Sequence, residues 1–445
     1  MRDVVICSIF AIAAAATLKR PYYGALLWVW IGLMNPHRLA WGFAYSLPFA
    51  MAAAGVTILG MLMNSKQVRA PKGFPLGVLA AFLIWMGLTT AMAIHVEPSV
   101  SKYIEVIKIF GMLFVVSSLV RTREEIIGLV WVIVLSIGYF GFKGGLFTIL
   151  TGGGFRVWGP PSSLVSGNNE IAIAFIMIIP LMYFLVQQAE VAATVAASLR
   201  KVTVKWIQRG LYAGMVLTAA SAVGSHSRGA LLAIVAMGAM LWWRSKSKAA
   251  LGFGLLLLTP LLFTLMPEEW FSRMNTIQTY EEDESAQGRL NAWAMAFNIA
   301  NDRVFGAGFA TATQYVYALY APDPTTVLVA HSIYFQILGD HGYIGLLLYL
   351  TFWISTYRLG ARLTRVTRGI PEVEWAGQLG AMARVSLVGF AVGGAFLSLA
   401  YWDMPFYICV LMVAADRLVQ QHLTTTRRAL HSGVPRFDDL SQARA

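Results

Sequence analysis

A few ionisable residues stand out in a sequence that is otherwise strongly apolar. Three of them fall in VAHSIYFQILGDHGYIGLLLYL, residues 329–350, namely His331, Asp340 and His341. Ionisable groups are costly in hydrocarbon, so three of them in one apolar stretch need an explanation. A histidine titrates near neutral pH and can take a proton from a hydroxyl group, which makes His331 a candidate general base. A lone histidine is more commonly a structural residue, so its surroundings must decide.

Arginines and lysines at the edges of apolar runs form the second candidate group. A planar guanidinium binds phosphate oxygens in pairs, so several arginines together could neutralise a pyrophosphate at a membrane surface. Each one alone could instead extend from a helix end to the interface. The residues concerned are Arg156 in GGGFRVWG, Arg228 in SHSRGALLA, Arg289 in QGRLNAW, and the lysines Lys102, Lys108 and Lys143.

The loop around Arg156 has a composition that suits a binding site. The three glycines at 152–154 let the backbone approach a ligand closely, and the GPP at 159–161 fixes a turn. Asn168, Asn169 and Glu170 follow where the chain returns to an apolar run. These three residues either cap the next helix or contribute to binding.

The position of Asp340 and His341 depends on whether the chain is one helix from His331 onward. A continuous helix would place them about 15 Å deeper than His331, near the centre of a bilayer. Glycines flank the pair in Gly339-Asp340-His341-Gly342 and favour a break there. We therefore predict a short interfacial helix over 331–338 and a span over 342–357, with all three polar residues near the membrane surface. Asp340 then either orients His331 or caps the second helix.

The elements that must position these residues are membrane helices. The chain has 445 residues, of which 58% are hydrophobic and only 13% charged. A soluble domain carries about a quarter charged residues, so the composition indicates an all-α polytopic membrane protein. The net charge of +12 comes from basic residues dispersed between apolar runs. This pattern is typical of cytoplasmic loops and argues against nucleic-acid binding.

The apolar runs predict about 12 transmembrane helices and one long loop on the side opposite the basic loops. Residues 1–266 hold the first helices, 267–332 the long periplasmic loop with a helix around 286–300, 333–416 the last helices, and 417–445 a cytoplasmic tail. The first two runs are either two brief helices or one broken element. The predicted segments are 4–18, 22–34, 46–63, 74–94, 103–120, 125–142, 171–187, 210–224, 229–243, 249–266, 342–357, 381–400 and 404–416.

Residue types that hold metals or cofactors are not arranged in any familiar pattern. Cys7 and Cys409 lie inside apolar runs near opposite ends of the chain, which is typical of packing residues. The sequence has no HExxH motif and no zinc-type His/Cys cluster. We therefore predict chemistry that needs neither a metal nor a cofactor.

Taken together, these segments resemble the O-antigen ligase family and its wider class of O-antigen polymerases and related oligosaccharide ligases. The resemblance rests on SHSRGALLA (225–233), on GRLNAW and VFGAGFA within 288–310, and on HSIYFQILGDHGYIGLLLYL (331–350). Two positions depart from the family pattern: Val304-Phe305 stands where a proline often precedes Gly-x-Gly, and Ser332 where asparagine is common. NPHR (35–38) and FKGG (142–145) resemble the ligases found beside exosortase systems.

The resemblance implies a GT-C-type membrane glycosyltransferase in a bacterial inner membrane, with its active site facing the periplasm. The implied donor is a glycan on undecaprenyl pyrophosphate, and the implied acceptor is a sugar hydroxyl of lipid A–core. His331 would activate the acceptor for an inverting, metal-independent transfer. Arg228, Arg289, Arg156 and Lys108 would hold the pyrophosphate. Asp340, Ser332 and Trp293 would support them.

Two other interpretations remain open from the sequence. An O-antigen polymerase or a protein O-oligosaccharyltransferase would use the same chemistry with a different acceptor. A transporter of lipid-linked glycans would instead have ionisable residues near the midplane and an internal repeat. The basic residues collect on one predicted face and no repeat is evident, which favours the transferase.

Overall fold

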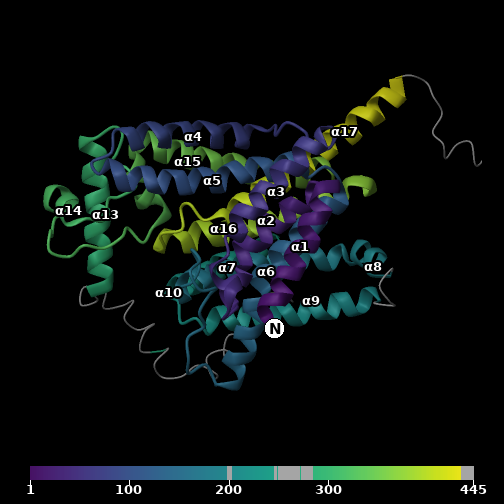
Figure 1. The fold of residues 1–445 in the computed structure, drawn as a ribbon, viewed down its shortest axis with the longest axis horizontal. Coiled ribbons are helices and arrows are strands. Elements are labelled where there is room, and N and C mark those ends of the chain that lie inside the picture. The colour runs from purple at the N-terminus through teal and green to yellow at the C-terminus, as the bar shows by residue number, and fades with distance from the viewer. Residues whose placement is uncertain (198–202, 245–247, 249–270, 272–283, 432–445) are drawn as a thin grey trace, which may run out of the picture.

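The computed structural model describes residues 1–445 apart from 198–202, 245–247, 249–270, 272–283 and 432–445, and every regular element in the described part is a helix (Figure 1). The chain is a helical membrane protein, and the predicted segment 249–266 lies outside the described residues. Five of the described helices are long and apolar enough to cross a membrane, namely Phe74–Ala91, Arg123–Leu150, Asn168–Gln187, Ile333–Val366 and Pro371–Phe396, and three shorter ones are apolar, namely Tyr22–Met34, Phe49–Met63 and Arg228–Trp243.

The described α-helices are, in chain order, α1 (Arg2–Lys19), α2 (Tyr22–Met34), α3 (Phe49–Met63), α4 (Phe74–Ala91), α5 (Val96–Leu119), α6 (Arg123–Leu150), α7 (Asn168–Gln187), α8 (Ala189–Ala197), α9 (Val204–Val223), α10 (Arg228–Arg244), α13 (Glu284–Asp302), α14 (Gln314–Tyr320), α15 (Ile333–Val366), α16 (Glu374–Gly393) and α17 (Asp403–His431). Short 3-10 turns are η1 (Pro36–Leu39), η2 (Phe43–Ser46), η3 (Ser65–Gln67), η4 (Pro371–Val373) and η5 (Gly394–Phe396).

The bundle is built around α7, whose side chains are almost all buried. Apolar residues surround this helix on every side, as expected for a helix in the interior of a larger assembly. The helix packs against α6, α9, α10 and α16; α16 in turn packs against α15, and α15 against α4. α13 packs against α15 and α14 and lies beside one end of the α4 and α15 pair (Figure 1).

The first two apolar runs form two separate helices, which settles the alternative left open by the sequence. α1 and α2 pack against each other and against α3. The chain reverses at Arg20-Pro21, where a proline precedes the first residue of α2. The reversal brings the Asn64 amide to the carbonyl of Leu18 at 2.8 Å.

The glycines after Phe142 belong to a helix, whereas the sequence predicted the start of a loop there. α6 continues to Leu150. A Cβ at Gly145 would lie 2.0 Å from the carbonyl oxygen of Leu217 in α9, so the absent side chain lets the two helices cross closely. Small residues commonly allow such close approach between membrane helices. The glycine-rich loop therefore spans residues 151–167, and Lys143 is a helical residue.

α15 contains the break that the sequence predicted. The helix begins at Ile333, is interrupted at Gly342 with φ 67° and ψ −171°, and continues to Val366, beyond the predicted span of 342–357. Asp340 and His341 are buried within the protein, with relative exposures of 2% and 0%. Other helices and a loop cover the break, so both side chains lie in the protein interior.

The last helix continues past the predicted end of the last span. The sequence predicted a span that ends at 416 and a tail from 417, and α17 continues as a helix from Asp403 to His431. Its last turns project beyond the rest of the bundle (Figure 1). The residues after 431 lie outside the described part of the chain.

The helix predicted around 286–300 in the long loop is confirmed by α13. The part of this loop after 283 has a small apolar core of its own, which joins α13 to α14 through Met295, Ile299, Val316 and Tyr317. The hydroxyl of Tyr317 donates a hydrogen bond to the carbonyl of Leu328. This part of the loop is therefore a packed unit, as its aromatic content suggested.

Basic residues from several of the loops between apolar runs gather at one end of the bundle. The backbone N–H of Arg69 donates to the Ser118 carbonyl at 3.0 Å, and the Arg121 guanidinium donates to the Lys66 carbonyl at 3.4 Å. Arg358, Arg362 and Arg417 line a cavity together with Lys72. This end lies away from His331, because α15 separates Arg358 from His331 by about 40 Å at 1.5 Å per residue.

Candidate functional site

His331 is held in place through its backbone and its neighbours. Its φ is +43°, which is uncommon for a residue with a side chain. The backbone N–H donates a hydrogen bond to the hydroxyl of Ser398 at 3.0 Å. Such a conformation persists only where the surroundings determine it, and strained backbone of this kind is common at functional sites.

Trp293 on α13 fixes the chain on either side of His331. Its indole N–H donates to the carbonyl of Ala330 at 2.7 Å. Its ring stacks on Phe335, with centroids 4.9 Å apart and an interplanar angle of 6°. Trp293 therefore connects the residue before His331 to the first turn of α15.

The imidazole of His331 is half-buried beside a guanidinium. Burial lowers the pKa of His331 from its ordinary value, and the positive charge of Arg289 lowers this pKa further. Arg289 lies four residues before Trp293, so the two side chains project from the same face of α13. Near neutral pH the imidazole is consequently uncharged and able to accept a proton.

The start of α7 approaches the same place. Glu170 in its first turn lies within electrostatic range of Arg289. The sequence left open whether 168–170 cap this helix or bind a ligand; the residue before the helix is Gly167, and no side chain caps it. Asn168 instead donates from its amide to the carbonyl of Ser225 at 2.8 Å, and so ties α7 to the turn before α10.

The loop that carries Arg156 is bonded to the turn over residues 224–228, which precedes Arg228. His226 uses its ring Nε2–H to donate to the Gly153 carbonyl at 2.8 Å, and the N–H of Val157 donates to the Gly224 carbonyl at 3.2 Å. These bonds anchor the glycine-rich loop on both sides of Arg156. Arg228 is the first residue of α10, immediately after this turn.

The turn η5 links Arg228 to His331. A Cβ at Gly229 would lie 3.5 Å from Phe396, and one at Gly394 would lie 2.8 Å from Ile333. Ser398, which holds the backbone of His331, follows two residues after η5. The residues Arg156, Arg228, Arg289 and His331 are thus carried by adjoining elements around the start of α7.

Asp340 and His341 form a separate polar network with the hydroxyl of Tyr401 at its centre. Tyr401 donates to the Asp340 carboxylate at 2.7 Å, and its oxygen lies 2.9 Å from His341 Nε2. His341 Nδ1 lies 2.6 Å from the hydroxyl of Thr89, and Asp340 also accepts from Thr311 at 3.3 Å.

The other residues that were predicted to act with His331 do not all lie close to it. Asp340 bonds to Tyr401 and Thr311, about 13 Å along α15 from His331. Ser332 is buried and precedes the first residue of α15, whose N-terminus no side chain caps. Lys108 is exposed on α5, about 18 Å from the start of that helix. The structure thus brings Trp293 to His331, but leaves Asp340 and Lys108 elsewhere.

Five side chains of these two sites were not predicted from the sequence, namely Ser398, Tyr401, Thr89, His226 and Thr311. Ser398 and Tyr401 come from the segment between α16 and α17, and Thr89 comes from α4; each reaches its partner across a long sequence separation. Of these residues, only His226 lies in a motif that the sequence had singled out, namely the SHSR stretch. Hydroxyl groups of this kind are common in membrane helices and carry no signature.

Potential metal ligands are dispersed in the described residues. No group of three or more His, Cys, Asp or Glu side chains is placed there to hold a metal ion. The described site therefore consists of one imidazole, a set of guanidinium groups and backbone.

Comparison with known families divides the chain into two parts. Residues 1–190 match a family of unknown function (DUF5935). Residues 213–350 match the family described as O-antigen ligase, and this match includes Arg228, Arg289, Trp293 and His331. No curated protein matches the chain significantly. The match over residues 213–350 supports an assignment to the O-antigen ligase family, and this family suggests a membrane glycosyltransferase of the ligase and polymerase class.

Proposed function

We propose that the protein transfers a glycan from undecaprenyl pyrophosphate to a sugar hydroxyl of lipid A–core, at the periplasmic face of a bacterial inner membrane. The observation that carries this proposal is the fixed position of His331, whose backbone N–H bonds to Ser398 and whose neighbour Ala330 is held by Trp293 on the same helix face as Arg289. The imidazole accepts a proton near neutral pH while the guanidinium supplies fixed positive charge. A displacement that expels a pyrophosphate needs both.

His331 removes the proton from the acceptor hydroxyl as its oxygen attacks the anomeric carbon of the donor sugar. The new C–O bond forms as the bond from that carbon to the pyrophosphate oxygen breaks, so the transfer inverts the configuration. Undecaprenyl pyrophosphate leaves with the bonding electrons. The proton on His331 then passes to solvent, which restores the base.

The arginines stabilise the charge that develops on the leaving group. Arg289 lies beside His331, and Arg228 and Arg156 are held by the turn at 224–228, so all three can face a pyrophosphate at the membrane surface. Preorganised charges of this kind are commonly worth factors of about 10² to 10³ in rate each. Glu170 keeps Arg289 in place when the donor is absent.

The proposal is tested by reconstituting the purified protein with a lipid-linked glycan donor and isolated lipid A–core. We expect mass spectrometry to detect the glycan on lipid A–core, with a rate that EDTA leaves unchanged. Glycan extension on a second lipid-linked repeat would identify a polymerase instead, and glycan on a protein would identify a protein-glycosylating ligase. Loss of the rate with EDTA and its recovery with a divalent cation would contradict the metal-independent mechanism.

A further inference from the structure

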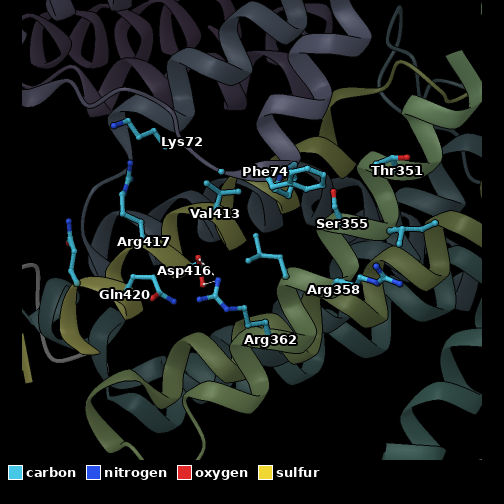
Figure 2. A pocket seen from close by; sticks show the side chains of 15 residues that line it. Lys72, Phe74, Thr351, Ser355, Arg358, Arg362, Val413, Asp416, Arg417 and Gln420 are labelled. Carbon is cyan, nitrogen blue, oxygen red and sulfur yellow. Dashed lines mark hydrogen bonds and ion pairs between the residues drawn. The ribbon is translucent and has the colours of Figure 1, made fainter. Parts of the chain in front are cut away.

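A cavity lies at the basic end of the bundle, far from His331. Its volume is about 970 Å³, and it is enclosed by the start of α4, the second half of α15 and the middle of α17 (Figure 2). Lys72 and Phe74 line it from the α4 side, Arg358 and Arg362 from α15, and Asp416 and Arg417 from α17. The family match ends at residue 350, before the α15 and α17 residues that form this cavity.

The charged side chains of this cavity are mainly basic. Lys72, Arg358, Arg362 and Arg417 give four positive charges against one negative charge from Asp416, which leaves a formal charge of +3 (4 − 1). Arg362 pairs with Asp416 at 3.2 Å, the interaction drawn as a dashed line in Figure 2. The guanidinium of Arg417 donates to the carbonyl of Val120.

Two of the cations have no such partner in the part of the chain that the structure describes. Among the described residues, neither Lys72 nor Arg358 forms an ion pair or a side-chain hydrogen bond. The N-terminus of α4, which also borders the cavity, has no side-chain cap. Uncapped N–H groups at a helix start add to the attraction for an anion.

The uncharged part of the lining combines polar residues, namely Thr351, Ser355, Gln420 and Gln421, with apolar ones that reach the outer surface of the bundle. Phe74 and Ile354 are 71% and 52% exposed, and Leu359 and Val413 complete the wall. A free phosphate would use the basic side chains but would have no contact with these hydrophobic ones. A molecule with an anionic head and hydrocarbon chains uses both parts.

We propose that this cavity binds the phosphate headgroup of an anionic glycerophospholipid, with the acyl chains along Phe74 and Ile354. Basic pockets between membrane helices at the cytoplasmic side are suited to such headgroups, and each arginine or lysine near the surface contributes about 1 kcal/mol to the attraction. The bound lipid would join α4, α15 and α17 at the end of the bundle opposite His331. This site does not depend on the proposed transferase reaction.

The test measures binding and thermal stabilisation of the purified full-length protein in a neutral detergent. Phosphatidylglycerol is titrated into the sample and compared with phosphatidylcholine of the same chain length and with inorganic phosphate. We expect phosphatidylglycerol to raise the melting temperature in a saturable manner and the other two to have little effect. Equal stabilisation by phosphatidylcholine, or full stabilisation by inorganic phosphate, would overturn the proposal.

A pair of charge-matched variants locates the site. Arg358→Gln removes an exposed cation of the cavity that has no protein partner in the described residues, and it should weaken phosphatidylglycerol binding about fivefold. Arg365→Gln removes an exposed arginine from the same helix outside the cavity lining and should leave the affinity unchanged. Equal affinities of the two variants would overturn the assignment. Melting temperatures without added lipid confirm that both fold.

A competition experiment distinguishes a glycerophospholipid from a polyprenyl phosphate, which shares the phosphate and the hydrocarbon. We expect native mass spectrometry to detect phosphatidylglycerol released from the wild-type protein and less of it from Arg358→Gln. Displacement of this lipid by an equimolar amount of polyprenyl phosphate would assign the cavity to the polyprenyl lipid and overturn the proposal.

Discussion

His341 in α15 and His331, two residues before the start of that helix, occupy opposite kinds of environment. Both ring nitrogens of His341 are engaged, by Thr89 and by Tyr401, and the residue is fully buried. In the described residues, the ring of His331 makes no hydrogen bond, whereas its backbone is fixed by Ser398 and its neighbours by Trp293. A histidine whose two ring nitrogens both have hydrogen-bond partners stabilises the structure. A histidine whose backbone is fixed but whose ring nitrogens have no such partners is available for chemistry.

The largest effect is expected at His331. His331→Ala removes the base, so we expect kcat to fall by about 10² to 10⁴ while the melting temperature stays close to that of the wild type. Laddering of lipopolysaccharide in a ligase-null strain and a thermal melt of the purified protein measure the two quantities. Normal laddering with the variant would remove His331 from the mechanism.

Arg289 is expected to follow, with an effect on both rate and pH dependence. Arg289→Ala should lower kcat about 10² to 10³-fold, because a charge facing the leaving group is lost. It should also move the acidic limb of the pH–rate profile to higher pH, since Arg289 lowers the pKa of His331 and its removal lets that pKa rise. An unchanged acidic limb would mean that protonation of His331 does not determine the pH dependence of the rate.

The same substitution at His341 should lower the stability of the protein and leave kcat nearly unchanged. His341→Ala removes one of two partners from each of the buried hydroxyls of Thr89 and Tyr401, which keep the Met86 carbonyl and Asp340, and each lost hydrogen bond costs about 1 kcal/mol. We expect a lower melting temperature and yield, with kcat per folded molecule within a few-fold of wild type. A stable variant without activity would reverse the contrast between the two histidines.

The smallest effect is expected at Trp293. Trp293→Phe keeps an aromatic ring against Phe335 but loses the hydrogen bond to the Ala330 carbonyl. The loss of one such bond is worth about 1 kcal/mol, so kcat should fall about fivefold with little change in KM. Trp293→Ala should lower kcat further, because the stacking is lost as well. A change in KM alone would assign Trp293 to substrate binding.

The sequence predicted the kind of fold and the break in α15 because both follow from local composition. Apolar runs specify helices, and the glycines around Asp340 and His341 mark the break at Gly342. The end of α6 was placed too early because glycines were taken as loop residues. Gly145 serves a helix crossing, which depends on the position of Leu217 in α9 and leaves no local pattern.

The partners of the two histidines were beyond reach of sequence reasoning for a similar reason. Trp293 and Arg289 share a helix face, so their joint approach to one place was predictable once a helix was expected there. The hydroxyls of Ser398 and Tyr401 reach α15 from a later segment of the chain, and only the packing of α16 against α15 brings them there. The environment of Asp340 therefore differed from every role considered for it.

The Gly306–Gly308 segment packs on the break in α15, and this contact restricts how the loop before α15 can be exchanged. The backbone N–H groups of Ala307 and Gly308 donate to the carbonyls of Gly339 and Asp340, which the interrupted helix would otherwise leave open. A Cβ at Gly306 would lie 2.7 Å from the backbone of Asp340. A chimera that exchanges the loop before α15 with that of another protein of similar fold must therefore carry this joint intact.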